Sequence, residues 1–486
     1  MLKLTTKIKL KRILNIAIPS GLQGAFDMLS MAMALFFLGQ ISPLNFTALG
    51  TGANYVIVFF PFSAIFGIGT NVLMSRRYGA KNYSEMNSVY ATMHIAAAIF
   101  SILVLALAWA CLPLYLKALN LSEELYTLTH SYVSLTMFAI PSIMIKNVLI
   151  SGFAATGDTK RPFYVKIFLT FFSIAGYYTL IDGSFGMPAL GLSGAAITTL
   201  FVSYLELFIL FLLPFFVKTQ LRLSLAFQSS FLVSALKVGF PTALERVFGI
   251  FSLNVVLIFV GSYAGAYSPF GSFQVVLDSI LSFLDALHLG IFSAFILALV
   301  GGKIYKDSAM TGFQAGTKIE GFSFLPGFGF MVAVMSLVGQ SIGAKKYHLA
   351  EDYTRISALI ASVILGVCGV ILAVFAEPFS KIFIAKDSMA VQISIWYLIA
   401  VGLSQVPMIL SFIYDGTLRG AGYTQIPLFI NIGSMSLFRL LPMWICSHYG
   451  LEIYFLFIII FTETYIRSLI FYLAFKSGIW KKPKEL

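Results

Sequence analysis

Six acidic residues stand inside long apolar stretches of this sequence. They are Asp27, Glu206, Glu245, Glu320, Asp415 and Glu463. A carboxyl group in an apolar setting can take up and release a proton, or hold a cation such as Na⁺, because desolvation penalises the free charged form. An ionisable residue in a membrane-spanning segment is costly, and is therefore a candidate functional group by default.

Two of these acids have a local explanation in the sequence. Asp415 stands four residues before Arg419, and Glu463 stands four residues before Arg467. Residues four apart share one helix face, so each acid is expected to form an ion pair within its own helix. Glu206 has no such partner nearby, and the sequence does not separate a packing role from a functional one.

Glu245 is the strongest candidate for a coupling carboxylate. It follows Pro241 and lies about eight residues from the inner surface, a depth of about 12 Å at 1.5 Å per residue. A pair with the adjacent Arg246 is the alternative, but neighbouring helical residues point about 100° apart. Gln23 stands four residues after Pro19, which repeats the spacing of Glu245 from its own proline. We expect Gln23 and Glu245 to face one shared cavity.

Three further residues complete the candidate set. Glu320 either serves the same cavity or pairs with Lys318, and Asp27 lies midway along the first apolar stretch. The predicted ion-coupling residues are Glu245, Asp27 and Glu320. The predicted substrate-binding residues are Gln23, Glu245, Gln314 and Glu320.

Histidine and cysteine give no further site. The histidines at positions 94, 130, 288, 348 and 448 are scattered, and the cysteines at 111, 368 and 446 sit in apolar runs. Neither set has the spacing of a metal site or of a nucleophile with its base. We expect no enzyme activity, no metal site and no cofactor other than H⁺ or Na⁺ as a coupling ion.

The candidate carboxylates require elements that cross a membrane. The chain has 486 residues, of which 59% are hydrophobic and 11% charged, whereas about a quarter of a soluble protein is charged. Its apolar segments are about as long as a spanning helix and apolar all round. We predict an all-α polytopic membrane protein with twelve transmembrane helices. They lie near residues 13–39, 46–73, 87–115, 127–155, 162–182, 190–216, 234–262, 314–341, 353–380, 389–416, 426–447 and 450–475.

The formal net charge is +12, and the basic residues that produce it are distributed unevenly between the two sides of the predicted topology. With the N-terminus inside, the outer segments hold only the lysines at 117, 303, 306, 381 and 386, and the inner segments hold many more basic residues. This positive-inside pattern predicts a multi-pass protein with both termini cytoplasmic, and it makes nucleic acid an unexpected partner. The basic start MLKLTTKIKLKR is interpreted as the flank of a retained first span, not as a cleaved signal peptide.

The sequence repeats itself once, in the same order. Pro19 and Pro241 are 222 positions apart, as are Gly39 and Gly261; Gly79 of GAKNY and Gly343 of GAKKY are 264 apart, and Pro162 and Pro427 are 265 apart. An even number of spans in each half predicts a parallel repeat around a central cavity. The predicted domains are a six-helix lobe at 1–217, a cytoplasmic linker at 218–233 and a second six-helix lobe at 234–486.

The rise of the offset from 222 to 264 places an insertion at residues 266–307, on the outer face. Its residues Gln274, Asp278, Ser282 and Asp285 recur at helical spacing on one face. We predict an amphipathic helix along the outer membrane surface, with a re-entrant hairpin or a lid as the alternative.

Several motifs together carry a family resemblance. They are IFGIGTNVLMSRRYGAKN (65–82), SGFAATGDTKRPF (151–163), PALGLSGAA (188–196), GFPTALERVF (239–248), KIEGFSFLPGFGF (318–330) and LRGAGYTQIP (418–427). The chain resembles the multidrug and toxic compound extrusion (MATE) family of secondary transporters, within the multidrug/oligosaccharidyl-lipid/polysaccharide exporter superfamily. The resemblance covers nearly the whole chain except the insertion.

The resemblance implies a V-shaped pair of six-helix bundles in a bacterial cytoplasmic (inner) membrane. It also implies export of amphipathic, often cationic small molecules by alternating access, driven by inward H⁺ or Na⁺. We expect a monomer whose partners are the small-molecule substrate and the lipid bilayer. Many relatives carry an aspartate where this chain has Ala34, and another where it has Tyr177. Asp27 or Glu245 would then have to supply the coupling carboxylate.

Two other functions stay open. A lipid-linked oligosaccharide flippase of the same superfamily would favour a basic cavity for a pyrophosphate. The deep bases are Lys146, Arg246, Lys318, Arg439 and Arg467, which a similar number of acids balances. The second alternative is a membrane enzyme or scaffold that docks partners through the insertion.

Overall fold

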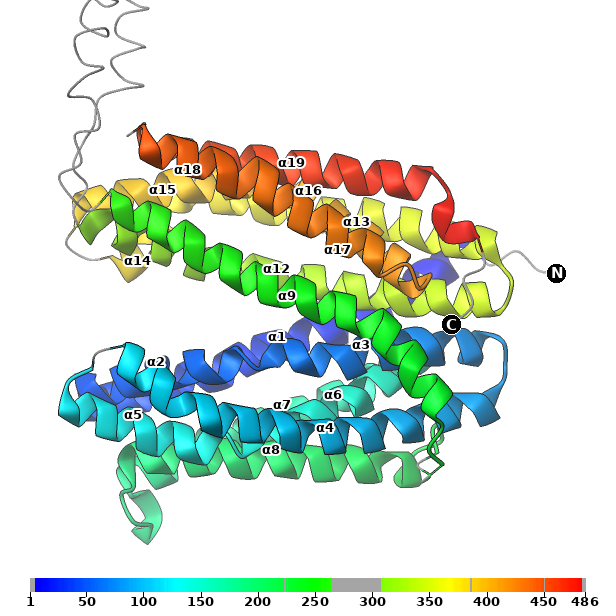
Figure 1. Ribbon diagram of the computed structural model, residues 1–486, viewed down its shortest axis with the longest axis horizontal. Coiled ribbons are helices and arrows are strands. Elements are labelled where there is room, and N and C mark those ends of the chain that lie inside the picture. Colours follow the sequence, from blue (N-terminus) through cyan, green and yellow to red (C-terminus); the bar gives the residue numbers. More distant parts are fainter. Residues whose placement is uncertain are drawn as a thin grey trace, which may run out of the picture.

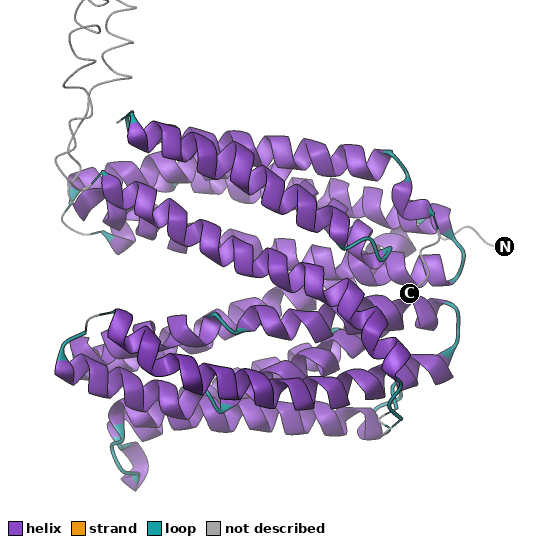
Figure 2. Cartoon of the chain, viewed as in Figure 1, coloured by secondary structure: helices purple, strands orange, loops and turns teal. Residues whose placement is uncertain are grey.

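The computed structural model describes residues 5–263 and 307–482, apart from residues 120, 223, 225, 385, 386 and 450. Throughout these residues the regular structure is helical, and short loops join the helices (Figure 2). Most of the predicted insertion at 266–307 lies outside the described residues; only its last residue, Asp307, falls within a described helix.

The first half of the chain forms the lower group of helices in Figure 1, which we call the N-lobe. Its elements are α1 (Thr6–Ile41), α2 (Pro43–Ile57), α3 (Phe60–Gly79), α4 (Tyr83–Ala118), α5 (Glu123–Thr136), α6 (Ala139–Thr156), α7 (Lys160–Asp182), the short 3₁₀ turn η1 (Ser184–Gly186) and α8 (Gly191–Phe216). The axes of α2 and α3 differ by 44°. Pro61 stands in the first turn of α3, where a proline costs no helical hydrogen bond.

The second half forms the upper group, the C-lobe. Its elements are α9 (Ser229–Ser262), α12 (Asp307–Gly343), α13 (Tyr347–Val374), α14 (Ala376–Phe383), α15 (Ser388–Leu403), α16 (Gln405–Gly420), α17 (Gln425–Ser434), the π-helical segment η2 (Met435–Leu440), α18 (Leu441–His448), α19 (Tyr454–Lys476) and η3 (Ile479–Lys481). A second bend, of 51°, separates α15 from α16. Because α9 begins at Ser229, part of the predicted linker at 218–233 is helical.

The described residues contain ten helices long and apolar enough to span a membrane, or twelve spans if each bent pair counts as one. The predicted spans coincide with these helices or with the bent pairs, with two differences: the span predicted at 127–155 also takes in most of α5, and the span predicted at 353–380 runs from α13 into α14. The predicted fold class, a polytopic all-α protein with twelve spans in two lobes, is confirmed. Hydropathy located the spans because each lies in an apolar stretch of the required length.

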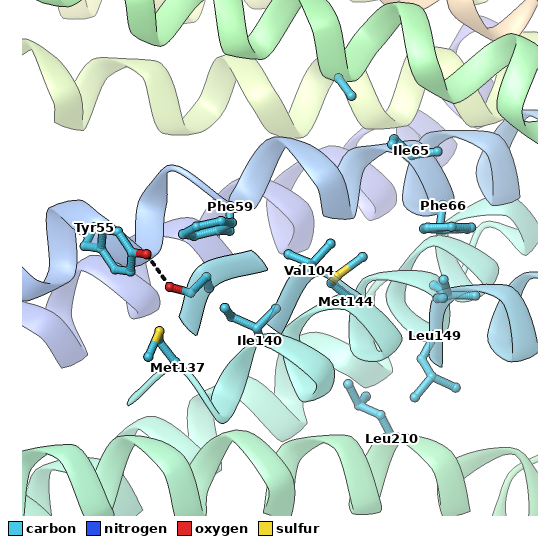
Figure 3. Close-up of a cluster of buried hydrophobic side chains, with 14 of the residues drawn as sticks. Tyr55, Phe59, Ile65, Phe66, Val104, Met137, Ile140, Met144, Leu149 and Leu210 are labelled. Atoms are coloured by element: carbon cyan, nitrogen blue, oxygen red, sulfur yellow. Dashed lines mark hydrogen bonds between the residues drawn. The ribbon is translucent and has the colours of Figure 1, made fainter. Parts of the chain in front are cut away.

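Aromatic and aliphatic side chains fill the N-lobe core (Figure 3). Tyr55 of α2 and Phe59 at the bend pack edge to face, with ring centroids 5.3 Å apart. The Tyr55 hydroxyl donates a hydrogen bond to the backbone oxygen of Ala108 in α4, at 2.5 Å. This bond satisfies the polar end of a buried ring, which would otherwise be costly in an apolar core.

The two lobes meet along two seams that repeat each other. In one, Gly329 of α12 lies so close to Ala17 of α1 that a Cβ atom on the glycine would collide with the alanine's backbone oxygen. In the other, Gly239 of α9 is equally close to the backbone oxygen of Ile65 in α3. The two pairs are equivalent in the repeat, because Ala17 and Gly239 are 222 positions apart and Ile65 and Gly329 are 264 positions apart. The contact therefore has approximate two-fold symmetry, as a parallel repeat requires.

The two copies of the repeated Gly-Ala-Lys turn, in GAKNY and GAKKY, also meet. A Cβ atom on Gly79 would collide with the backbone oxygen of Gln340, and one on Gly343 would collide with that of Arg76. Each of these polar residues reaches into the other lobe. The Gln340 amide donates to the backbone oxygen of Ala155 at 2.7 Å, and Arg76 donates to that of Ala421. We call Arg76, Gln340 and these two carbonyls the interlobe latch.

Both termini lie at the latch end of the molecule (Figure 1). At the opposite end the helices of the two lobes stand farther apart (Figure 1). Surface exposure follows this arrangement. On α1, Ala17 is buried at the seam, whereas Met31, which lies on the same helix face four turns further on, is 38% exposed. The lobes therefore touch at the latch end and expose their facing surfaces beyond it.

Candidate functional site

Glu245 of α9 joins three helices of the C-lobe. One of its carboxylate oxygens is 2.6 Å from a guanidinium nitrogen of Arg419 in α16. The other accepts a hydrogen bond of 2.9 Å from the side-chain amide of Asn431 in α17. Its side chain is 17% exposed. Glu245 is paired with Arg419 and not with its neighbour Arg246, as the angular separation of adjacent residues predicts.

Arg419 holds two carboxylates at once. Besides Glu245 it pairs with Asp415, one turn earlier in α16, at 2.5 Å, so the predicted pair within this helix is present. It also donates to the hydroxyl of Thr242 on α9. The side chain is 2% exposed. A buried guanidinium of this kind is stable only when its donors find acceptors, and these three partners accept four hydrogen bonds from it.

Glu463 of α19 is the centre of a second group. It lies 3.3 Å from Arg467, its predicted partner one turn later, and it also pairs with Arg439. Its carboxylate accepts a 2.8 Å hydrogen bond from Ser434. Ser434 and Arg439 are five residues apart, and side chains at this spacing in an α-helix point in directions about 140° apart. The π-helical segment η2 begins directly after Ser434 and contains Arg439, and its wider turn brings both side chains to Glu463.

Arg467 connects the two groups. It interacts electrostatically with Glu463 and Arg439 on one side, and with Glu245 and Asp415 on the other. We call the connected residues the C-lobe network; they are Thr242, Glu245, Asp415, Arg419, Asn431, Ser434, Arg439, Glu463 and Arg467. The network ties α9, a helix of the interlobe seam, to α16, α17 and α19.

Glu320 lies next to this network. It accepts a hydrogen bond from the hydroxyl of Tyr397 on α15, and it interacts electrostatically with Arg439. The proposed pair with Lys318 does not occur. Two residues apart on a helix, Lys318 and Glu320 point in different directions, and Lys318 is exposed.

The N-lobe holds a separate charged group. Glu206 of α8 lies 2.6 Å from Lys146 of α6 and 3.5 Å from Lys166 of α7. Lys166 also pairs with Asp27 of α1. Glu206 is 4% exposed and Asp27 is 63% exposed, so this chain of charges runs from the lobe interior to its surface. Glu206, which showed no partner in the sequence, is thus paired with two lysines.

The other predicted residues are placed differently. Gln23 has a buried side-chain nitrogen without a hydrogen-bond partner among the described residues. Gln314 is exposed on α12. Among the residues with described contacts, no hydrogen bond or ion pair joins Gln23, Asp27 or Gln314 to the C-lobe network. The structure therefore brings Glu245 together with other predicted acids, and leaves these three outside the group.

Ala34 and Tyr177, where the resemblance led us to expect aspartates, belong to the packed N-lobe core. Their exposures are 3% and 4%. The Tyr177 hydroxyl lies 3.0 Å from that of Thr199. Neither position retains a group that could bind a cation by charge, so the N-lobe carboxylates inside the apolar stretches are Asp27 and Glu206.

Sequence reasoning missed Asn431 and Lys166 as members of these groups. Asn431 is 186 positions from Glu245, and Lys166 is 40 from Glu206. Neither spacing is helical, so only the fold relates them. A lysine inside the predicted fifth span was a usable signal for Lys166, since a membrane-embedded lysine implies a partner.

Comparisons with known proteins agree with this fold. The MatE family model matches residues 19–179 and 286–445. A probable multidrug resistance protein NorM from Thermotoga maritima is 25% identical over 98% of this chain and 94% of its own length. The probable multidrug resistance protein YoeA from Bacillus subtilis is 22% identical over 91% of this chain and 88% of its own.

Solved structures share the whole architecture. A MOP-superfamily transporter from Pyrococcus furiosus aligns over 99% of this chain and 100% of its own, with a TM-score of 0.81 and 18% identity. A multidrug resistance MATE family transporter in an outward-facing conformation aligns over 98% and 99%, with a TM-score of 0.80 and 17% identity. The match of the family model over most of the sequence, supported by these likenesses, shows that the chain belongs to the multidrug and toxic compound extrusion (MATE) family of transporters.

Proposed function

We propose that this multidrug efflux transporter is a secondary active antiporter, which exports amphipathic compounds, cationic ones included, against inward H⁺ or Na⁺. The observation that carries the proposal is the position of Glu245. It is a carboxylate on a seam helix, it is 17% exposed, and it is held by Arg419 and Asn431. A cation that binds this carboxylate competes with the guanidinium for the same oxygens.

The contacts of Arg419 provide a route from ion binding to lobe movement. Arg419 stands two residues before Ala421, whose backbone oxygen accepts the latch hydrogen bond from Arg76 of the N-lobe. When a proton or Na⁺ neutralises Glu245, Arg419 retains Asp415 and its hydrogen bond to Thr242, and loses its ion pair with α9. The weaker tie between the end of α16 and the seam helix α9 then lets the two shift relative to each other, which loosens the latch.

The balance of charges supports a drug exporter over a flippase. The C-lobe network contains three carboxylates and three guanidinium groups, and the N-lobe group contains two carboxylates and two lysines. A site for a pyrophosphate would need an excess of basic groups. Neither group has one.

The experiment is ion-driven efflux from proteoliposomes that contain the purified protein. A cationic dye should leave its compartment when a pH or Na⁺ gradient is imposed, and the response to each gradient identifies the ion. Glu245→Gln keeps the size of the side chain and one acceptor oxygen but cannot bind the ion by charge. We expect this variant to fold and insert normally, to bind dye, and to lose gradient-driven transport. Transport at the wild-type rate in Glu245→Gln would contradict the assignment.

A further inference from the structure

Arg246 lies on the face of α9 that is directed at the N-lobe. Gly239 on that face packs against the backbone of Ile65, and Ala235, one turn earlier, packs against Gly69. Residues seven apart lie almost on the same helix face. Arg246 stands seven residues after Gly239, so it points from the seam helix toward the opposite lobe.

This face of α9 is uncovered beyond the seam. Arg246 is exposed, and Leu253, seven residues further along the same face, is 52% exposed. The outward side of α9 carries Phe240, Phe251 and Ile258, which lie roughly a third of a turn or more from Arg246. Arg246 therefore belongs to the exposed interlobe surface and not to the side that meets lipid.

The bend in the second span explains why this surface is open. Helices α3 and α9 run in opposite directions, because Ile65 is level with Gly239 and Gly69 with Ala235. Extended by seven residues, this spacing places Arg246 opposite the start of α3 and the 44° bend that precedes it, where Val58 stands. Val58 is 47% exposed. The arginine thus faces an apolar part of the other lobe across the opening.

Arg246 has no ion pair with any carboxylate in the described part of the chain. Its neighbour Glu245 is engaged by Arg419 and Asn431, and Asp415 is engaged by Arg419. Arg246 interacts with these groups only at longer range. The equivalent N-lobe residue is Gly24, which packs closely against Leu325 of α12. The repeat is broken at this position. The seam between α1 and α12 continues through Gly24, whereas the seam between α3 and α9 ends at the exposed guanidinium of Arg246.

We propose that Arg246 is a specificity-determining residue, which binds the carboxylate of an amphipathic substrate while the apolar body of that substrate rests against the interlobe surface. The proposal rests on the export function proposed above and names its substrate class, carboxylate-bearing amphiphiles, zwitterions among them. A guanidinium can bind a carboxylate through two parallel hydrogen bonds, a geometry that lysine cannot reproduce. The same group weakens the binding of a compound that carries only a positive charge, because like charges repel.

The test uses two dyes that differ only at one carboxylate. Rhodamine B carries a delocalised cation and a carboxylate, and its ethyl ester keeps the cation alone. Binding of each dye to purified protein in detergent is measured by fluorescence polarisation, and efflux of each dye from proteoliposomes is measured separately. We expect Arg246→Gln to weaken rhodamine B binding about tenfold, the effect of losing a charge-assisted hydrogen bond, and to leave the ester unchanged or bound more tightly.

The controls separate the inference from the proposed function. Arg246→Lys should recover only part of the affinity, and Arg222→Gln, which removes an exposed charge outside the seams, should leave both dyes unaffected. Equal effects of Arg246→Gln on both dyes, or no effect on either, would overturn the role of Arg246. If dye binding depends on Arg246 but no gradient drives efflux, the proposed antiporter function is rejected and the binding role of Arg246 is retained.

Discussion

In the described part of this protein, buried charges occur in connected groups, in which one residue is shared by several partners. Glu206 shows the consequence most simply, because it is the shared partner of Lys146 and Lys166 in the interior of the N-lobe. Lys146, 14% exposed, has Glu206 as its only ion-pair partner among the described residues, and Lys166, 13% exposed, shares Glu206 with Asp27. Removing the Glu206 carboxylate leaves Lys146 without an ion-pair partner in the lobe interior, which is far more costly than the loss of a surface ion pair.

We predict that Glu206→Gln destabilises the protein by about 3–5 kcal/mol, the usual cost of removing one member of a buried pair. Thermal unfolding in detergent should show a clearly lower midpoint. The control is Glu377→Gln, which removes an exposed partner of Lys381 one turn away and should leave the midpoint unchanged. If both variants unfold at the wild-type temperature, the N-lobe group does not stabilise the fold.

At the level of single residues, local pairs were predictable and distant ones were not. The pairs Asp415–Arg419 and Glu463–Arg467 follow from helical spacing alone, and both are present. The pairing of Glu245 with Arg419 joins positions 174 apart. That contact depends on how α9 packs against α16, which no local pattern in the sequence encodes. The same reason explains why Glu206 had no visible partner.

Among the elements, the glycines that end α3 and α12 decide how closely the lobes approach. Gly79 faces the backbone oxygen of Gln340, and Gly343 faces that of Arg76. Any side chain at either position would force the two helices apart, because the obstructing atoms belong to backbone that cannot rotate away. The close approach in turn places Gln340 within hydrogen-bonding distance of Ala155.

We predict that Gly79→Val shifts the protein toward a state in which the lobes are separated at the latch end. Spin labels at Ser84 and His348, two exposed positions on α4 and α13 near the latch, should report a longer distance by double electron–electron resonance. Cys111, Cys368 and Cys446 are first replaced by serine. Gly433→Val is the matched control, since no atom lies within 4 Å of a Cβ atom built there. An unchanged distance distribution in Gly79→Val would show that the latch tolerates the side chain.

The elements themselves differ in how far the sequence predicts them. Long apolar stretches identified every span, because hydrophobic length is a local property. The bends between α2 and α3 and between α15 and α16, and the π-helical segment η2, were not predicted. Proline is common in these helices, and α1, α4, α8, α9 and α12 contain one without being divided there. Whether a proline bends a span depends on its packing partners, and those are set by the tertiary structure.

For the whole molecule, the repeat in the sequence becomes a two-fold relation between the lobes. Ser75 and Gly339 are equivalent positions, 264 residues apart, and they contact each other directly: a Cβ atom on Gly339 would lie 3.0 Å from that of Ser75. The approximate axis therefore passes between α3 and α12 near the latch. The sequence offsets predicted that the two halves are related by a repeat. The end at which the lobes open could not be predicted from the sequence, because it depends on how the helices pack.

Alternating access requires the lobes to part at this axis, which yields a prediction for the whole transporter. Ser75→Cys combined with Gly339→Cys places two Cβ atoms 3.0 Å apart, so the helices need to separate by only about 0.5 Å to reach the Cβ separation of a disulfide, about 3.5–4.5 Å. Oxidation should join the lobes, abolish dye efflux from proteoliposomes and leave dye binding in detergent intact. Reduction should restore efflux, and each single cysteine variant should transport under both conditions. Efflux at the full rate with the disulfide formed would mean that transport does not open this seam, and the route from Glu245 through Arg419 to the latch would have to be abandoned.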